Sequence, residues 1–183
     1  MGINRLKRED TILALVDFQE RLLPAASDSA DLEEHIVKLV KGFRALSLPV
    51  LVTQQYTKGL GETIPSLRAV LGDFTPVEKT EFSAVKAPAF LEALEASGRR
   101  TVVITGIEAH VCVLQTALDL LEKGYQVFVA ADCCGSRSPL DKKYGEKRMA
   151  QAGAVWGTCE SVLFELCGGA REPGFKEISA IVK

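Results

Sequence analysis

Short apolar runs recur along this chain of 183 residues, spaced so that a helix fits between most of them. The four clearest, each rich in Val, Ile or Leu, are Thr11–Val16, Pro49–Thr53, Thr101–Thr105 and Tyr125–Ala131. None alternates apolar with polar residues, which is typical of strands covered on both faces. Two weaker strands are predicted at Val77–Thr80 and Ala154–Thr158.

Helical patterns separate these runs. They cover Asp31–Leu46, Pro88–Ser97, Ala109–Lys123 and a stretch around Tyr144–Ala152. Because strand and helix alternate, the sequence predicts an α/β fold with a parallel sheet. The length suits one globular domain, residues 1–183.

Composition narrows the possible partners. The formal net charge is −2, and the 22 Lys and Arg are scattered, so the electrostatic footprint of a nucleic-acid binder is missing. The first ten residues are too charged for a signal peptide, and no apolar run has the length of a membrane span. Five cysteines, an odd number, indicate reduced thiols. We therefore expect a cytoplasmic protein with a small-molecule substrate and neither nucleic acid nor membrane as a partner.

Chemistry-bearing residues follow the predicted strands. Asp17 follows the first strand, Gln54–Tyr56 the second, and Asp132 the fifth, while Lys79 ends the third and Gly106–Cys112 follow the fourth. Ligands of open parallel sheets bind outside the carboxyl ends of the strands. We therefore expect an acid, a cation and a thiol to converge on one edge of the sheet.

Cys112 falls in the first turn of a predicted helix. Unpaired N–H groups and the positive dipole end there favour a thiolate and predict a lowered cysteine pKa. A cysteine nucleophile also needs a proton acceptor and donors for an oxyanion. Our hypothesis is that Asp17 takes the Cys112 proton and later delivers it to the leaving nitrogen. Lys79 would steady both anions, and backbone N–H groups of Glu108 and Cys112 would receive the oxyanion.

Three segments, Leu15–Gln19, Glu78–Ser83 and Thr105–Val113, carry a family resemblance. In this order and spacing they resemble the isochorismatase-like cysteine hydrolases over nearly the whole chain. The resemblance implies a Rossmann-like three-layer fold whose six-stranded, mostly parallel sheet has helices on both faces. It also implies an Asp17, Lys79 and Cys112 triad, a cis peptide between Ile107 and Glu108, and a homo-oligomer with pockets near subunit contacts.

Departures from the family pattern shape the expected reaction. Nicotinamidases of the family carry an Asp and His metal cluster after the second strand, where this chain has Thr53–Tyr56, so we predict no metal and no cofactor. Isochorismatase itself acts on a vinyl ether without a thiol, so Cys112 favours cleavage of an amide-like C–N bond through a thioester. Two alternatives stay open: a vinyl-ether hydrolase with Asp17 as the acid, and a non-catalytic binding or scaffold protein.

The remaining polar and aromatic residues receive weaker interpretations. Candidates for the substrate pocket, with core packing or surface exposure as the alternative, are Phe18, Gln19, Tyr56 and Phe82. His110 lies two residues from Cys112 on a different helix face, so a structural role is favoured. Asp132 is interpreted as a structural turn or as a support for the site residues, Gly59–Gly61 as a lid loop, and the tail from Gly168 as a contact with a neighbouring subunit. Packing roles are expected for the other cysteines, which are Cys133, Cys134, Cys159 and Cys167.

Overall fold

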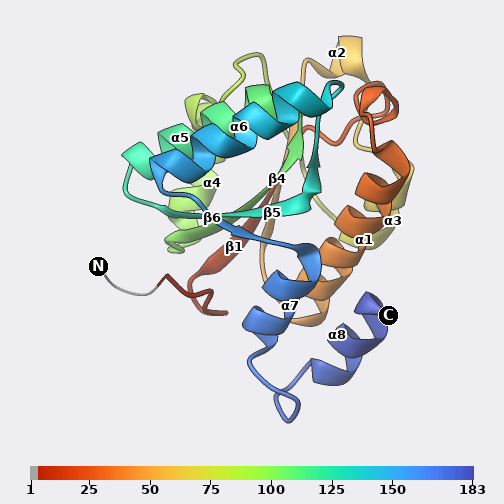
Figure 1. The fold of residues 1–183 in the computed structure, drawn as a ribbon, viewed down its shortest axis with the longest axis vertical. Helices are drawn as coiled ribbons and strands as arrows, with labels where there is room; N and C mark the ends of the chain where they lie inside the picture. The colour runs from red at the N-terminus through yellow and green to blue at the C-terminus, as the bar shows by residue number, and fades with distance from the viewer. Residues whose placement is uncertain (1–3) are drawn as a thin grey trace.

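The computed structural model describes residues 4–183, which form a six-stranded, all-parallel sheet between two layers of helices (Figure 1). The strand order is β3-β2-β1-β4-β5-β6. The strands are β1 (Thr11–Val16), β2 (Val50–Gln55), β3 (Val77–Lys79), β4 (Thr101–Ile107), β5 (Gln126–Gly135) and β6 (Val155–Gly157). The predicted fold class is confirmed, and the sheet expected to be mostly parallel is parallel throughout.

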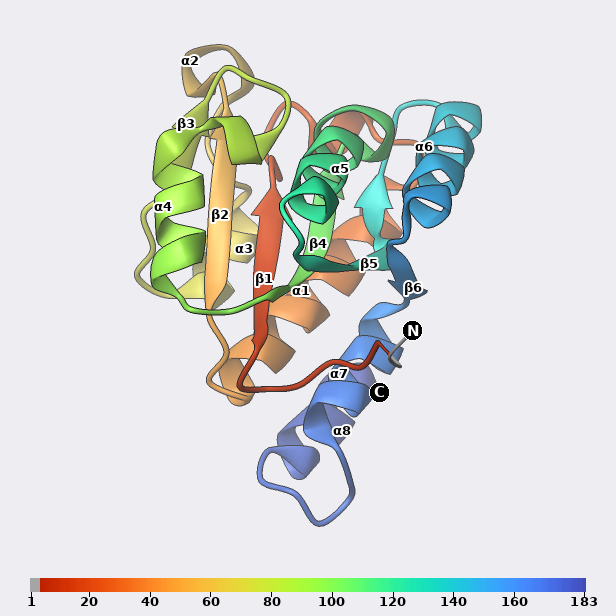
Figure 2. The same cartoon turned by 90° about the vertical axis from the view of Figure 1, so that its left-hand side faces the viewer.

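Helices cover both faces of the sheet. One face packs against α1 (Ser29–Ala45), α3 (Pro65–Leu71), α7 (Cys159–Cys167) and α8 (Phe175–Val182). The other carries α4 (Pro88–Ala96), α5 (Leu114–Glu122) and α6 (Pro139–Ala152), which face the viewer in Figure 2. Shorter turns complete the chain: α2 (Thr57–Leu60) and the helices η1 (Leu23–Ala25), η2 (Ala84–Lys86) and η3 (Ala109–Val113).

Each face of the sheet has its own hydrophobic cluster. In β1, Leu13 and Leu15 join the cluster beneath α1, whereas Ile12, Ala14 and Val16 join the cluster beneath α4 and α5. Successive strand side chains point to opposite faces, so a strand buried on both sides has no polar positions to alternate. This explains the unbroken apolar runs of the sequence.

Several elements begin or end at residues other than those predicted. Strand β5 extends beyond its predicted end at Ala131 to Gly135, because a register shift lets it continue alongside β4. Helix α6 begins at Pro139, well before Tyr144. The Ser138 hydroxyl accepts a hydrogen bond from the Asp141 N–H, and proline suits the first helical position.

Some helical segments were not predicted. The proposed lid loop at Gly59–Gly61 is largely the short helix α2, and α3 and α8 were also missed. The helix expected to carry Cys159 and Cys167 is α7. The tail from Gly168 folds back on its own chain, because α8 packs against α1 and α7 with Ile178 fully buried. Part of the segment assessed for a signal peptide, residues 1–3, lies outside the described residues. Across residues 4–183, every helix is too short or too polar to cross a bilayer.

Candidate active site

The strand order reverses between β1 and β4, and the candidate site lies at the carboxyl end of this pair. Open parallel sheets form their ligand crevice at such a reversal. Asp17, the residue after β1, turns the chain in the left-handed region with φ 59°, a conformation that aspartate tolerates better than most residues. Gly106 of β4 has φ 150°, and a Cβ there would lie 2.3 Å from the Val16 carbonyl oxygen. Glycine thus lets β4 approach β1 closely beside Asp17.

Asp17 and Lys79 form an ion pair that is closed to solvent. Lys79 Nζ lies 2.7 Å from Asp17 Oδ2, and neither side chain has any exposed area. The other carboxylate oxygen, Oδ1, accepts a hydrogen bond of 2.6 Å from the Thr53 hydroxyl of β2. Buried charges persist only when paired and hydrogen-bonded, and both conditions are met here.

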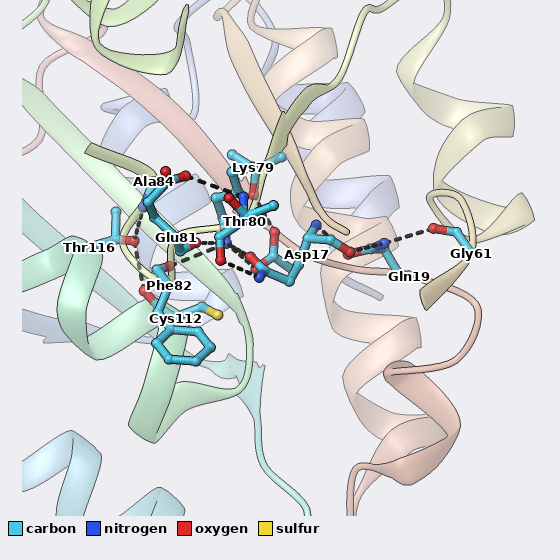
Figure 3. Close-up of polar contacts among 12 residues, drawn as sticks. Asp17, Gln19, Gly61, Lys79, Thr80, Glu81, Phe82, Ala84, Cys112 and Thr116 are labelled. Carbon is cyan, nitrogen blue, oxygen red and sulfur yellow. Dashed lines mark hydrogen bonds and ion pairs between the residues drawn. The ribbon is translucent and has the colours of Figure 1, made fainter. Parts of the chain in front are cut away.

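The Lys79 ammonium is surrounded by oxygen atoms. Besides Asp17, it donates to Gln55 Oε1 at 2.7 Å and to the carbonyl oxygens of Glu81 and Phe82 at 3.2 Å each (Figure 3). An ammonium has three protons, so these four acceptors use all of its donors. Lys79 therefore fixes both the Asp17 carboxylate and the segment that carries Phe82.

Cys112 lies in η3, a π-helical turn between β4 and α5, where a regular α-helical first turn was predicted. The Val113 N–H donates to the Glu108 carbonyl five residues earlier, which is the bond that defines a π-turn, and the Val111 N–H shares the same carbonyl. The Thr116 hydroxyl donates to the Cys112 carbonyl at 2.7 Å and accepts the Ala84 N–H at 2.9 Å (Figure 3). The cysteine turn is thereby tied to the segment that follows Lys79.

Burial raises the pKa of the Cys112 thiol to about 12. The Asp17 carboxylate adds to this rise, and the Lys79 ammonium opposes it. The prediction of a lowered pKa is therefore wrong for this structure, because desolvation outweighs any effect of the helix terminus. Asp17 and Lys79 both lie near enough to the Cys112 thiol to change its pKa, so the structure brings the three predicted side chains together. Cys112 is a protonated thiol at neutral pH.

The peptide bond between Ile107 and Glu108 is cis. The Glu108 carboxylate turns away to Arg137, accepting its Nε–H at 2.9 Å and its backbone N–H at 3.0 Å. Burial favours a higher pKa for Glu108, but the hydrogen bonds and charge of Arg137 outweigh it and leave the pKa below its ordinary value. The use of the Glu108 and Cys112 N–H groups as an oxyanion hole stays a prediction.

The four pocket candidates divide into two pairs. Phe18 is 1% exposed and packs in the cluster beneath α1, so it is a core residue. Gln19 is fully buried, and its amide bonds the backbone of Gln55 and the carbonyl of Gly61. Tyr56 and Phe82 are each about half exposed at the carboxyl edge of the sheet. Only the second pair is open to a ligand.

Other predicted residues lie away from the ion pair. His110 Nδ1 lies 3.0 Å from the Ser136 hydroxyl oxygen, in keeping with a structural role. Asp132 was placed after the fifth strand, but it lies within β5, where its carboxylate accepts the Cys159 N–H at the start of α7. All five cysteines are free thiols. Within residues 4–183, no three His, Cys, Asp or Glu side chains gather where a metal ion would fit.

Sequence reasoning placed Gln55 at this edge of the sheet without giving it a role and did not single out Thr53 and Thr116; these three residues hold the central side chains in place. Thr53 and Gln55 are alternate residues of β2 and so point to the same side of the sheet. A usable signal existed for this pair, because polar residues at the carboxyl end of a buried strand face the crevice. Thr116 had no such signal, since a threonine in a helix usually bonds its own turn.

The fold and the site together define an α/β protein with the isochorismatase-like hydrolase fold. The chain belongs to the isochorismatase-domain family, whose model, described as "Isochorismatase domain", matches residues 11–161. Isochorismatase domain-containing protein 1 of Salmo salar is 41% identical over 173 residues, which are 94% of this chain. The chain spans 61% of the length of that relative.

Two solved structures are similar over almost the whole chain. The MAR1 ribonuclease from Caenorhabditis elegans has a TM-score of 0.92 at 38% identity, covering 98% of this chain and 92% of the other. The YcaC gene product of Escherichia coli, described as an octameric hydrolase of unknown specificity, has a TM-score of 0.93 at 27% identity. That match covers 99% of this chain and 92% of YcaC.

Proposed function

We propose that this protein is a cofactor-independent cysteine hydrolase that cleaves a small amide-like C–N bond through a thioester on Cys112. The observation that carries the proposal is the buried Lys79–Asp17 pair beside the Cys112 thiol, whose pKa both side chains influence. A carboxylate, an ammonium and a thiol gathered in this way provide a proton acceptor, a fixed positive charge and a nucleophile. The hydrolase fold shared with YcaC supports the same reaction class.

Acylation begins with proton transfer from the Cys112 thiol to the Asp17 carboxylate. The sulfur attacks the substrate carbonyl carbon, a C–S bond forms, and the carbonyl π electrons move to the oxygen. Backbone N–H groups of Glu108 and Cys112 receive this oxyanion. As the intermediate collapses, the C–N bond breaks and Asp17 returns its proton to the nitrogen, which leaves as ammonia or an amine. A thioester remains on Cys112.

Deacylation uses the same groups in the opposite sense. Asp17, again a carboxylate, takes a proton from water as the water oxygen attacks the thioester carbon. The C–S bond then breaks, and the sulfur leaves as it receives the proton from Asp17. A carboxylic acid is released, and Cys112 returns to its thiol form. Lys79 keeps Asp17 aligned throughout, since its own donors are already used by protein oxygens.

The protonation state of Asp17 bears on the vinyl-ether alternative. That reaction needs a carboxylic acid that donates a proton to the substrate. Both Asp17 oxygens accept hydrogen bonds, one of them from an ammonium, which suits a carboxylate. The amide reaction starts from a carboxylate and is therefore favoured.

Ammonia release from a panel of small primary amides tests the proposal. We expect turnover by the wild-type protein and losses of at least about 1000-fold in Cys112→Ala and Asp17→Asn. Mass spectrometry of the acid-quenched reaction is expected to show the acyl group on the Cys112 peptide. Retained turnover in Cys112→Ala would reject the covalent route.

An RNA oligonucleotide is the contrasting substrate, because the C. elegans structure carries the name ribonuclease. The net charge of −2 differs from the positive charge typical of nucleic-acid binding, so we expect no cleavage. RNA cleavage that survives Cys112→Ala would replace the amide proposal with a nuclease.

We further propose a homo-oligomer with a cytoplasmic location. Leu140 and Tyr144, four residues apart on α6, are exposed large apolar side chains that a second subunit would cover. Five free thiols suit a reducing compartment. Light scattering after gel filtration tests the assembly: a multiple of the 19.8 kDa chain mass supports it, and a monomer contradicts it.

A further inference from the structure

Gln55, the last residue of β2, bonds the lysine of the candidate catalytic ion pair. Its Oε1 accepts the Lys79 ammonium at 2.7 Å, the same length as the bond from Lys79 to Asp17. The two strands pair in parallel, with Gln55 opposite Lys79 in the register. The amide therefore reaches the ammonium directly from the neighbouring strand.

The orientation of the Gln55 amide is determined by its two partners. While Oε1 faces the ammonium, the Nε2 group donates to the Thr80 carbonyl at 2.8 Å. A flipped amide would place NH₂ protons against the ammonium and its oxygen against a carbonyl oxygen, losing both bonds. The segment Lys79–Thr80 thus holds the amide in one rotamer.

The backbone of Gln55 is held just as firmly. Gln19 Oε1 accepts the Gln55 N–H at 2.7 Å, and Gln19 Nε2 donates to the Gln55 carbonyl at 3.0 Å and to the Gly61 carbonyl at 2.7 Å (Figure 3). Gln19 follows Asp17 by two residues, so the chain that supplies the carboxylate also fixes the residue that holds the ammonium.

We infer that Gln55 is a positioning residue that holds the Lys79 ammonium against Asp17 while adding no charge of its own. A neutral acceptor is required, because a second carboxylate at this point would share the ammonium with Asp17. The charged and titratable groups that face this ammonium are Asp17, Glu81 and Cys112. The inference rests on the proposed function, in which Asp17 and Cys112 react and Lys79 aligns them.

The need for a neutral side chain at position 55 is tested with Gln55→Glu. This substitution keeps the shape and the oxygen acceptor but adds a negative charge. The readout is the rate of Cys112 alkylation by iodoacetamide between pH 6 and 10, followed on the Cys112 peptide by mass spectrometry. We expect a rate about tenfold lower at pH 8 and a rate profile displaced upward by about one pH unit, because nearby negative charge disfavours the thiolate. A profile that superimposes on the wild type overturns the inference.

Gln55→Leu separates the geometry from the charge, and Gln54→Leu is its matched control. Gln54 is the neighbouring glutamine of β2, and its amide bonds Thr57 and Thr63 and not the ion pair. We expect Gln55→Leu to slow Cys112 alkylation about threefold, less than the tenfold expected for Gln55→Glu because no charge is added, and Gln54→Leu to match the wild type. Equal rates in the two leucine variants overturn the inference, even if Gln55→Glu does not fold.

The outcome is distinguishable from failure of the proposed function. If Cys112→Ala abolishes ammonia release while the Gln55 variants alkylate like the wild type, only the inference is wrong. If Cys112→Ala keeps turnover, the proposed function is wrong, whereas the alkylation profiles still report whether Gln55 positions Lys79.

Discussion

Two cation–carboxylate pairs lie at the carboxyl edge of the sheet. Their N–O distances are similar, but their burial differs. Lys79 and Asp17 lie 2.7 Å apart with no exposed side-chain area. Arg137 and Glu108 lie 2.9 Å apart, with 69% and 11% of their side chains exposed. Exposed pairs contribute little to stability, and buried pairs must offset the loss of hydration. A buried pair is weak evidence for stability, so its position beside Cys112 points to chemistry.

The largest expected effect comes from breaking the buried pair on one side. Lys79→Met leaves the Asp17 carboxylate buried with only Thr53 as a partner. Loss of one member of a buried pair costs about 3–5 kcal/mol, and we expect the free energy of unfolding to fall by that amount. Urea denaturation followed by circular dichroism measures it.

Two variants serve as controls for this prediction. Lys142→Met removes a lysine whose partner, Asp28, is 38% exposed, and we expect a much smaller loss. The double variant Asp17→Asn/Lys79→Met removes both charges, so it should be more stable than Lys79→Met alone. A double variant that is less stable than the single one would show that charge burial is not the cause.

The stability of the protein at alkaline pH tests the surroundings of the buried pair, because the neighbouring Cys112 thiol titrates there. Its pKa rises from 9.0 to about 12 in the folded protein, so the folded state binds the thiol proton more tightly than the unfolded state. The resulting stability is complete below pH 9 and is lost as pH rises toward 12. We expect the wild type to lose about 2 kcal/mol more than Cys112→Ala between pH 9 and 11. Parallel urea titrations of the two proteins check this, and identical pH dependence would contradict the raised pKa.

A smaller effect is expected from the hydroxyl that completes the buried carboxylate. Thr53→Val keeps the shape of the side chain but leaves Asp17 Oδ1 without the 2.6 Å bond. An unsatisfied buried acceptor costs about 1–3 kcal/mol, measurable by thermal unfolding. Thr63→Val is the matched control, since Thr63 is about equally buried but its hydroxyl bonds Gln54 instead of the ion pair. If both variants lose equal stability and equal activity, the Thr53 bond is not specific to the site.

The smallest effect belongs to the exposed pair. Arg137→Ala removes a guanidinium that water already solvates, so we expect no measurable change in melting temperature. The pKa of Glu108 should rise, because the side-chain bonds and charge of Arg137 that oppose the effect of burial would be lost. Carboxyl chemical shifts of Glu108 in an NMR titration report this change. A large loss of stability would erase the distinction between the two pairs.

Much of the fold was predictable from the sequence, because strands buried on both faces leave an unbroken apolar record. Strand β1 begins at Thr11 and ends at Val16, as predicted. The helices α3 and α8 were not predicted, because they are only seven and eight residues long. That is too short for the 3.6-residue period to stand out. The continuation of β5 to Gly135 depends on a register shift against β4, which no local pattern encodes.

The site, too, could be predicted only in part. Asp17, Lys79 and Cys112 could be predicted because each lies at or just after a strand end, and parallel strands bring their ends together. The raised pKa of Cys112 could not, because it depends on how completely α5, α6 and the η2 segment exclude water. Adjacency in sequence to Asp17 likewise does not give the direction of a side chain, so the sequence left Phe18 and Gln19 between the pocket and the core, and the structure buries both.

Gly145 lets α6 pack directly on the turn that carries Cys112. A Cβ at this position would lie 2.7 Å from the Cα of His110, so the helix and the cysteine turn touch backbone to backbone. A larger residue at position 145 would have to displace η3 or α6, although it would alter no polar group of the site. The close approach of α6 to the cysteine turn therefore depends on the absence of a single methyl group.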